Sequence, residues 1–324
     1  MIRFQQTPDS FFVEEIPLYE PSGQGRYVFL RIRKRDCSTM EAKRRIARWA
    51  GVNKDKIRHA GMKDRASTST QWLSWDAGGR PLPMDPAPDL IEILDCSYHE
   101  NNLSVGHLSA NRFRIILDCQ DEIISEERLA LPFPNYYGPQ RFGRMDTSKE
   151  AILQRIAKPA RDRHLISVIQ AWFFNQYLQE RLNGEAWQPS EQELWTKSNG
   201  KRVFQCPWED VSERFDTGEV MPTGPVFGYK MQTTTEEESW LGNLGLEKEA
   251  FRAWGSIAKG ARRPILARPI IHGVQTGEDK LSLDFTLPSG VYATVFLTHL
   301  FKPWLLNSGQ TMPDFTESVV LSDR

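Results

Sequence analysis

Cysteine and histidine are scarce in this chain, and neither is spaced as a metal site requires. Its 324 residues hold four cysteines without a C-x-x-C pair, and six histidines without H-x-x-x-H spacing. The sequence therefore indicates neither a zinc site nor a disulfide framework. No apolar run reaches the length of a signal peptide or a membrane span. We expect a folded, cytoplasmic protein that holds no metal and does not enter a membrane.

Three common catalytic or nucleotide-binding motifs are also missing. There is no G-x-x-x-x-G-K-[ST] loop and no G-x-S-x-G elbow. The pair Gly23 and Gly25 precedes a strand-like segment, whereas the glycines of a dinucleotide-binding turn follow a strand. P-loop, Rossmann and α/β-hydrolase chemistry are therefore disfavoured.

Positive charge is concentrated in one segment although the net charge is only -1. Residues 31–65 contain thirteen lysines and arginines against four acidic residues, a local balance of +9. Such a segment is typical of a surface that contacts a phosphate backbone. A helix with a solvated basic face explains the same charges equally well.

A run of small, hydroxyl-bearing and charged residues at 61–71 places Asp64 between Lys63 and Arg65. A carboxylate between two cations stays ionised at neutral pH and can act as a nucleophile or base. A solvated turn has the same composition, so the run alone decides nothing.

Hydrophobic periodicity predicts a chain in which strands and helices alternate, with a change of texture after Pro132. Ser38 and Glu41 form a capping box, and Gly51 ends the helix that they begin. Asp64 falls in the loop after this helix. The stretch 183–224 has no clean period, and we expect irregular structure with some helix there. The expected strands are 11–16, 27–33, 71–75, 112–117 and 281–287, and the expected helices are 39–50, 121–131, 164–182 and one from Ala293.

Six segments, in this order, resemble motifs of the TruD family, the tRNA pseudouridine synthases that modify uridine 13. The opening PDSFFVEE and the run GMKDRASTSTQ are followed by NRF at 111–113 and by PNYYGPQRFG at 134–143. The helical start of the family's insertion and the returning strand LPSGVYAT complete the set. Tyr292 departs from the family pattern, which has phenylalanine at this position.

The resemblance implies an α+β fold of two domains, V-shaped, with an RNA-binding cleft. Residues 1–150 and 266–324 would form a discontinuous catalytic domain with a mixed, largely antiparallel sheet and flanking helices. Residues 151–265 would form an inserted, mostly α domain. A monomer is the default expectation.

The resemblance also assigns roles to single residues. Asp64 would be the catalytic residue. The residues expected to bind the substrate are Phe11, Asn111, Phe113 and Tyr292. The residues expected to support the site or bind RNA are Lys63, Arg65, Arg31, Arg33, Lys34 and Arg141, of which Arg141 could instead tie loops together by an ion pair.

The implied reaction converts uridine 13 of transfer RNA to pseudouridine without a cofactor, because the isomerisation oxidises nothing. Two alternatives stay open. The chain could modify another RNA by the same mechanism, or it could bind RNA without catalysis, in which case Asp64 would be a bystander.

Overall fold

The computed structural model describes residues 2–79, 81–119, 126–143, 145–156, 158, 161–182, 187–198, 202–301 and 304–306. The chain divides into two compact units. The first comprises Met1–Leu131, Pro269–Gly290 and Pro303–Thr311, and the second comprises Pro132–Arg268, Val291–Lys302 and Met312–Arg324. Among the described residues, no helix is long and apolar enough to cross a membrane.

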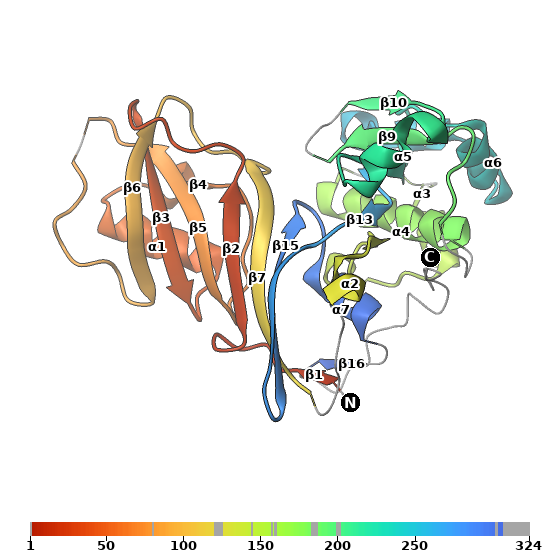
Figure 1. Cartoon of the computed structure of the whole chain (residues 1–324). Coiled ribbons are helices and arrows are strands. Elements are labelled where there is room, and N and C mark those ends of the chain that lie inside the picture. The colour runs from red at the N-terminus through yellow and green to blue at the C-terminus, as the bar shows by residue number, and fades with distance from the viewer. Residues whose placement is uncertain are drawn as a thin grey trace. The chain divides into compact units, whose positions relative to one another are not determined.

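The first unit is built on a mixed sheet whose main path runs β14-β15-β7-β2-β5-β3-β6 (Figure 1). Strands β2 and β5 are parallel, and the other neighbours along this path are antiparallel. The fold class is therefore α+β, as predicted. The path strands are β2 (Phe11–Pro17), β3 (Tyr27–Arg35), β5 (Thr68–Asp76), β6 (Ile91–His99), β7 (Leu108–Asp118), β14 (Ile270–Thr276) and β15 (Lys280–Pro288).

Three short strands extend this sheet away from its main path. Strand β1 (Ile2–Phe4) pairs with β16 (Trp304–Leu306) and with β7, and β4 (Arg58–His59) pairs with β5. The short segment η1 (Lys54–Lys56) precedes β4, and α2 (Glu126–Ala130) follows β7. The first part of the helix predicted over 121–131 lies outside the described residues.

Helix α1 (Thr39–Trp49) covers one face of this sheet because its apolar side matches the inward side chains of β3 and β5. The Ser38 side chain accepts a hydrogen bond from the Glu41 N–H and caps the helix, as predicted. Ala42 and Ile46 are fully buried against Leu30, Leu73 and their neighbours. One hydrophobic core of the first unit therefore lies between α1 and the sheet.

The second unit combines helices with a four-stranded sheet of order β10-β9-β11-β12. The long helix α4 (Arg163–Leu182) is confirmed, and twelve of its residues are buried. Over 183–224 we expected irregular structure with some helix; the helix is present as α5 (Trp208–Asp216), but the prediction missed the strands β9 and β10 and the start of β11. Proline and glycine inside β11 hide its strand pattern. The sheet strands are β9 (Leu194–Lys197), β10 (Val203–Gln205), β11 (Val220–Val226) and β12 (Ala261–Pro264).

The remaining elements of the second unit surround these. They are β8 (Phe133–Pro134), η2 (Pro139–Arg141), α3 (Lys149–Ile156), α5 (Trp208–Asp216), α6 (Thr235–Asn243), η3 (Lys248–Ala258), β13 (Leu266–Ala267) and α7 (Ala293–Leu300). Strands β8 and β13 pair with each other. The division into domains at 150 and 266 stays a prediction.

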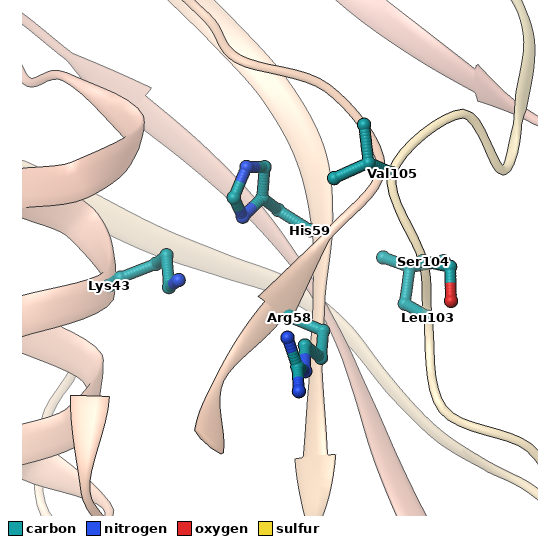
Figure 2. A pocket seen from close by; sticks show the side chains of 6 residues that line it. All are labelled: Lys43, Arg58, His59, Leu103, Ser104 and Val105. Carbon is teal, nitrogen blue, oxygen red and sulfur yellow. The ribbon is translucent and has the colours of Figure 1, made fainter. Parts of the chain in front are cut away.

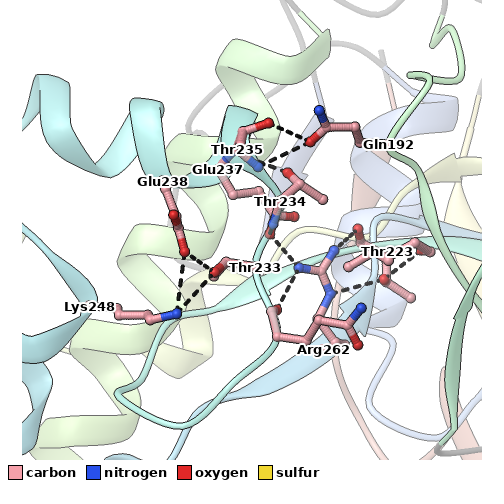
Figure 3. A network of polar contacts seen from close by, with 11 residues as sticks. Gln192, Thr223, Thr233, Thr234, Thr235, Glu237, Glu238, Lys248 and Arg262 are labelled. Atoms are coloured by element: carbon pink, nitrogen blue, oxygen red, sulfur yellow. Dashed lines mark hydrogen bonds and ion pairs between the residues drawn. The ribbon is translucent and has the colours of Figure 1, made fainter.

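A buried polar network ties α6 to the small sheet (Figure 3). Arg262 Nη1 lies 2.6 Å from Glu237 Oε2, and both side chains are almost completely buried. Arg262 Nε also donates to Thr223 Oγ1 at 3.1 Å. Thr234 and Glu237 form a capping box at the start of α6, so one carboxylate serves both the helix end and the arginine.

Candidate active site

Asp64 lies in the loop before β5. Its side chain is exposed, and its main-chain carbonyl is held by hydrogen bonds from buried side chains. Its carbonyl oxygen accepts one hydrogen bond from Lys34 Nζ and another from Ser67 Oγ, each at 2.8 Å. Lys34 and Ser67 are fully buried. The structure therefore presents an accessible carboxylate on a peptide group whose position is fixed by buried donors.

The residue before Asp64 is anchored as firmly. The Lys63 N–H donates to Thr39 Oγ1 at 2.8 Å, and that hydroxyl donates to Gln71 Oε1 at 2.8 Å. The Lys63 ammonium forms a buried ion pair with Glu15, with Nζ and Oε2 separated by 3.0 Å. Through these contacts the loop is tied to α1, β5 and β2 together.

The two cations beside Asp64 in the sequence are directed at other carboxylates. Lys63 pairs with Glu15, and Arg65 Nε lies 3.4 Å from Asp36 Oδ1 at the exposed surface. Burial raises the pKa of Glu15, and Lys63 opposes that effect. Their expected role of keeping Asp64 ionised stays a prediction.

Lys34 is electrostatically coupled to Asp64. Burial lowers the pKa of Lys34 to about 8, while Cys37 and Asp64 act in the opposite direction. Its ammonium also donates to the Cys37 carbonyl. The two roles predicted for Lys34, support of the site and RNA contact, stay predictions.

Asn111 of β7 shares a sheet face with the anchor residue Glu15, since the two are direct partners in the β2–β7 register. Its Oδ1 atom is buried and has no hydrogen-bond partner among the described residues. An unpaired buried acceptor costs free energy in the absence of a ligand. This atom is therefore available to a donor that enters the site.

Phe11 and Phe113 belong to a row of aromatic rings on the same face. The ring of Phe113 stacks on Phe285 with centroids 5.5 Å apart and on Phe11 at 6.2 Å. All three rings are buried. Their packing fixes the strand that carries Asn111, and the roles predicted for Phe11 and Phe113 in substrate binding stay predictions.

Arg31 and Arg33 point to the opposite face of the sheet from Lys34, because side chains alternate along β3. Arg31 forms an ion pair with Glu14, and Arg33 Nη1 lies 2.8 Å from Glu92 Oε2. Neighbouring residues of one basic run thus serve different surfaces.

Tyr292 and Arg141 belong to the second unit, where both lie near Tyr137. The Tyr137 and Tyr292 rings meet edge to face at 6.2 Å, and the Arg141 guanidinium lies 5.5 Å from the Tyr137 ring centroid. Burial raises the pKa of Tyr292, and Arg141 and Arg263 oppose it. Arg141 forms no ion pair with a described carboxylate. The described part of the chain therefore does not support the ion pair by which Arg141 was expected to tie loops together.

Metal ligands are not gathered at this site or elsewhere in the described ranges, where no group of three or more histidine, cysteine, aspartate or glutamate side chains could hold an ion.

Comparison with known proteins decides the family. The model of tRNA pseudouridine synthase D (TruD) matches residues 2–162 and 158–300. The chain belongs to the TruD family. Two curated relatives named tRNA pseudouridine synthase D are 34% identical, from an Anaeromyxobacter species, and 31% identical, from Thermus thermophilus. The first alignment covers 97% of this chain and 95% of the relative, and the second covers 94% and 90%.

A solved structure shares the TruD fold. It is a crystal structure from Methanosarcina mazei, described as a tRNA pseudouridine synthase D, which is 21% identical to this chain. The TM-score is 0.64, and the match covers 93% of each chain.

The sequence did not predict three residues that anchor this candidate site: Glu15, Thr39 and Ser67. A signal for one of them was present. Glu15 is in phase with the apolar Phe11 and Val13, which places a carboxylate on a buried face and requires a partner there.

Proposed function

We propose that this chain isomerises uridine 13 of transfer RNA to pseudouridine, with Asp64 as the reactive carboxylate. Membership of the TruD family supports the reaction. The observation that carries the role of Asp64 is its exposed carboxylate on a peptide group held by Lys34 and Ser67. Such a group can reach a nucleotide without moving its own support.

The reaction replaces one bond to the sugar by another. The bond between uracil N1 and sugar C1′ breaks, C5 joins C1′, and a proton leaves C5 while N1 gains one. No electrons enter or leave, so the proposal needs no redox cofactor. Asp64 either adds to the uracil ring or attacks or assists at C1′, and both routes require an accessible carboxylate.

Positioning is the main contribution of the loop contacts. The target base must first leave its stack, and small errors in the placement of a nucleophile then cost large factors in rate. Buried hydrogen bonds at Lys63 and Asp64 fix two successive peptide groups. The main chain that carries the carboxylate is thereby fixed before the substrate arrives.

Asn111 supplies a polar contact for the base in this proposal. Its unpartnered Oδ1 would accept a hydrogen bond from a uracil N–H, which would satisfy a buried acceptor. The packing of Phe113 supports β7, the strand that carries Asn111. The assignment of Tyr292 to the pocket rests on the family resemblance alone.

The substitution Asp64→Asn tests the proposal, because asparagine keeps the shape and the main-chain contacts while removing the charge. We expect pseudouridine formation in purified transfer RNA to fall by roughly 10³-fold or more, with RNA affinity within about twofold of wild type. Asp85→Asn, at an exposed loop position, is the matched control. Conversion at the wild-type rate by the Asp64→Asn protein would show that another group acts.

Mapping pseudouridines in total RNA, with and without the protein, separates the proposal from its alternatives. New pseudouridine at position 13 of transfer RNA is the expected result. Pseudouridine at other sites alone would identify a different RNA substrate. No new pseudouridine, with RNA binding intact, would favour the non-catalytic alternative.

A further inference from the structure

A cavity of about 140 Å³ opens between α1, β4 and the loop at 103–105 (Figure 2). Three basic side chains from two elements border it: Lys43 of α1, and Arg58 and His59 of β4. A space of this size accommodates several water molecules or one small anion. Its remaining lining is Leu103, Ser104 and Val105, so no acidic side chain borders it.

Lys43 distinguishes this cavity from an ordinary basic surface. Three lysines are buried among the described residues, and two of them, Lys34 and Lys63, have buried acceptors for their ammonium groups. Lys43 is only 9% exposed and has neither an ion pair nor a hydrogen bond with a described residue. Burial of the side chain and the nearby Arg58 lower its pKa, and Asp55 opposes them. A mostly buried lysine beside another cation is stabilised when an anion binds next to its ammonium.

His59 supplies a second unpaired atom at the same place. Its Nδ1 is buried and has no hydrogen-bond partner among the described residues. Burial lowers the pKa of the imidazole, with Lys43, Lys63 and Arg58 acting in the same direction. The neutral ring can still donate one N–H. Arg58 is exposed and forms no ion pair with a described carboxylate, so its guanidinium is also available.

The wall of the cavity is fixed. The Gly106 N–H donates to the Ala60 carbonyl at 2.9 Å, and the Leu103 N–H donates to Ser74 Oγ at 2.9 Å. Gly106 has φ of 91°, a left-handed conformation that favours glycine. These bonds hold the 103–106 loop against β4 and β5 before any ligand binds.

We propose that this cavity binds a backbone phosphate of the RNA substrate, an inference that rests on the proposed function. Lys43, Arg58, His59 and Ser104 offer donors, and a phosphodiester offers acceptors and a negative charge. Arg58 and Val105 are exposed, so the cavity reaches the surface, as a polymer backbone requires. His59 lies five residues before Asp64. A phosphate bound here would therefore position the RNA relative to the segment that leads to the active site.

The substitution Lys43→Met tests the inference because it keeps the length of the side chain and removes the charge. We expect the Kd for transfer RNA to rise roughly tenfold, and the slope of log K against log salt to shrink by about one. The KM for transfer RNA should rise, while kcat at saturating RNA stays within about twofold. Lys280→Met, at an exposed strand position of the same unit, is the matched control and should change neither quantity.

Thermal unfolding separates a ligand site from a structural lysine. In phosphate-free buffer, Lys43→Met should unfold at the wild-type temperature or above it, because the substitution removes the repulsion between Lys43 and Arg58. Inorganic phosphate should raise the Tm of the wild type and of Lys43→Arg, but not that of Lys43→Met. A lower Tm for Lys43→Met with unchanged RNA affinity would overturn the inference.

Two further outcomes would also overturn it. Wild-type RNA affinity in Lys43→Met would exclude a backbone contact. A phosphate-dependent Tm shift that Lys43→Met loses without any change in RNA binding would assign the cavity to free phosphate. The Asp64→Asn protein is measured beside these variants, and its loss of isomerisation with intact binding is judged separately. The phosphate site and the proposed reaction can therefore fail independently.

Discussion

Lys34→Met is the most informative change in the active-site loop, because it removes a buried cation and keeps the buried volume. The ammonium of Lys34 donates to the carbonyls of Asp64 and Cys37. After the substitution, the Asp64 carbonyl keeps its bond from Ser67 at 2.8 Å. The substitution thus removes one of the two hydrogen bonds to the Asp64 carbonyl and opens no cavity.

Two opposing effects set the stability of this variant. Each lost charge-assisted hydrogen bond costs roughly 1.5–3 kcal/mol. The fall in the pKa of Lys34 from 10.5 to about 8 corresponds to about 3 kcal/mol spent on keeping a buried ammonium charged, and methionine restores that amount. The net loss is then at most about 3 kcal/mol, and we expect a folded protein.

The folded variant should also be a slower catalyst. We expect kcat for pseudouridine formation to fall roughly 10- to 100-fold, because the Asp64 carbonyl is then held by Ser67 alone. The KM for transfer RNA should stay within about twofold, since Lys34 is fully buried and cannot touch a phosphate. Single-turnover kinetics with purified transfer RNA, beside Lys280→Met as the control, measure both constants.

Two results would refute this reasoning. An unchanged kcat in folded Lys34→Met would show that the loop needs no support from below. A raised KM with an unchanged kcat would instead assign Lys34 to RNA contact.

The Lys34 charge also makes the stability of the wild type depend on pH, and Lys34→Met should lack this dependence. Because the folded protein lowers the pKa of Lys34, the unfolded chain binds more protons between pH 8 and 10.5. Wild-type stability should therefore rise with pH across this range, by up to about 3 kcal/mol relative to Lys34→Met. The cost of the charge is fully present below pH 8 and absent above 10.5. Urea unfolding of both proteins at several pH values measures the difference.

Two further predictions concern one polar group in each unit. Asn111→Leu removes the unpartnered buried acceptor, so we expect an unchanged or slightly higher Tm with kcat/KM lowered roughly 10- to 100-fold, and wild-type turnover would exclude contact with the base. Burial raises the pKa of Glu193 from 4.5 to about 7 against the opposing effect of Arg181, so its contribution to stability is full below pH 4.5 and is lost as the pH rises to 7. In urea unfolding, the free energy of unfolding of wild type should fall between pH 4.5 and 7 by up to about 3 kcal/mol more than that of Glu193→Gln. Parallel curves of this free energy against pH would contradict the assignment.

Much of the first unit could be predicted from periodicity and caps. The strand of Phe11, the helix after Ser38 and the strand after Asp64 lie where the sequence placed them. These elements obey a single local rule each, whether alternation, capping or helical spacing. The stretch 183–224 obeys none, since β11 contains two prolines and a glycine and its strand character comes from pairing with β9 and β12.

The candidate site was less accessible to sequence reasoning because its contacts join distant segments. The Lys63 ammonium meets Glu15, 48 residues away, and the Asp64 carbonyl meets Lys34, 30 residues away. A local charge pattern cannot show which partner a long side chain selects. The sequence therefore singled out Asp64 and placed its electrostatic support on the adjacent Lys63 and Arg65.

Strand alternation changes the meaning of the basic run that includes Arg31, Arg33 and Lys34. In β3, Lys34 is in phase with the buried Ile32 and turns toward the loop of Asp64, while the two arginines turn to the other face. One segment thus supplies a support for the carboxylate on one side and surface charges on the other. Because the Lys34 ammonium is buried, salt and RNA phosphates screen its interaction with Asp64 much less than they screen the surface arginines, and this interaction is present before the substrate binds.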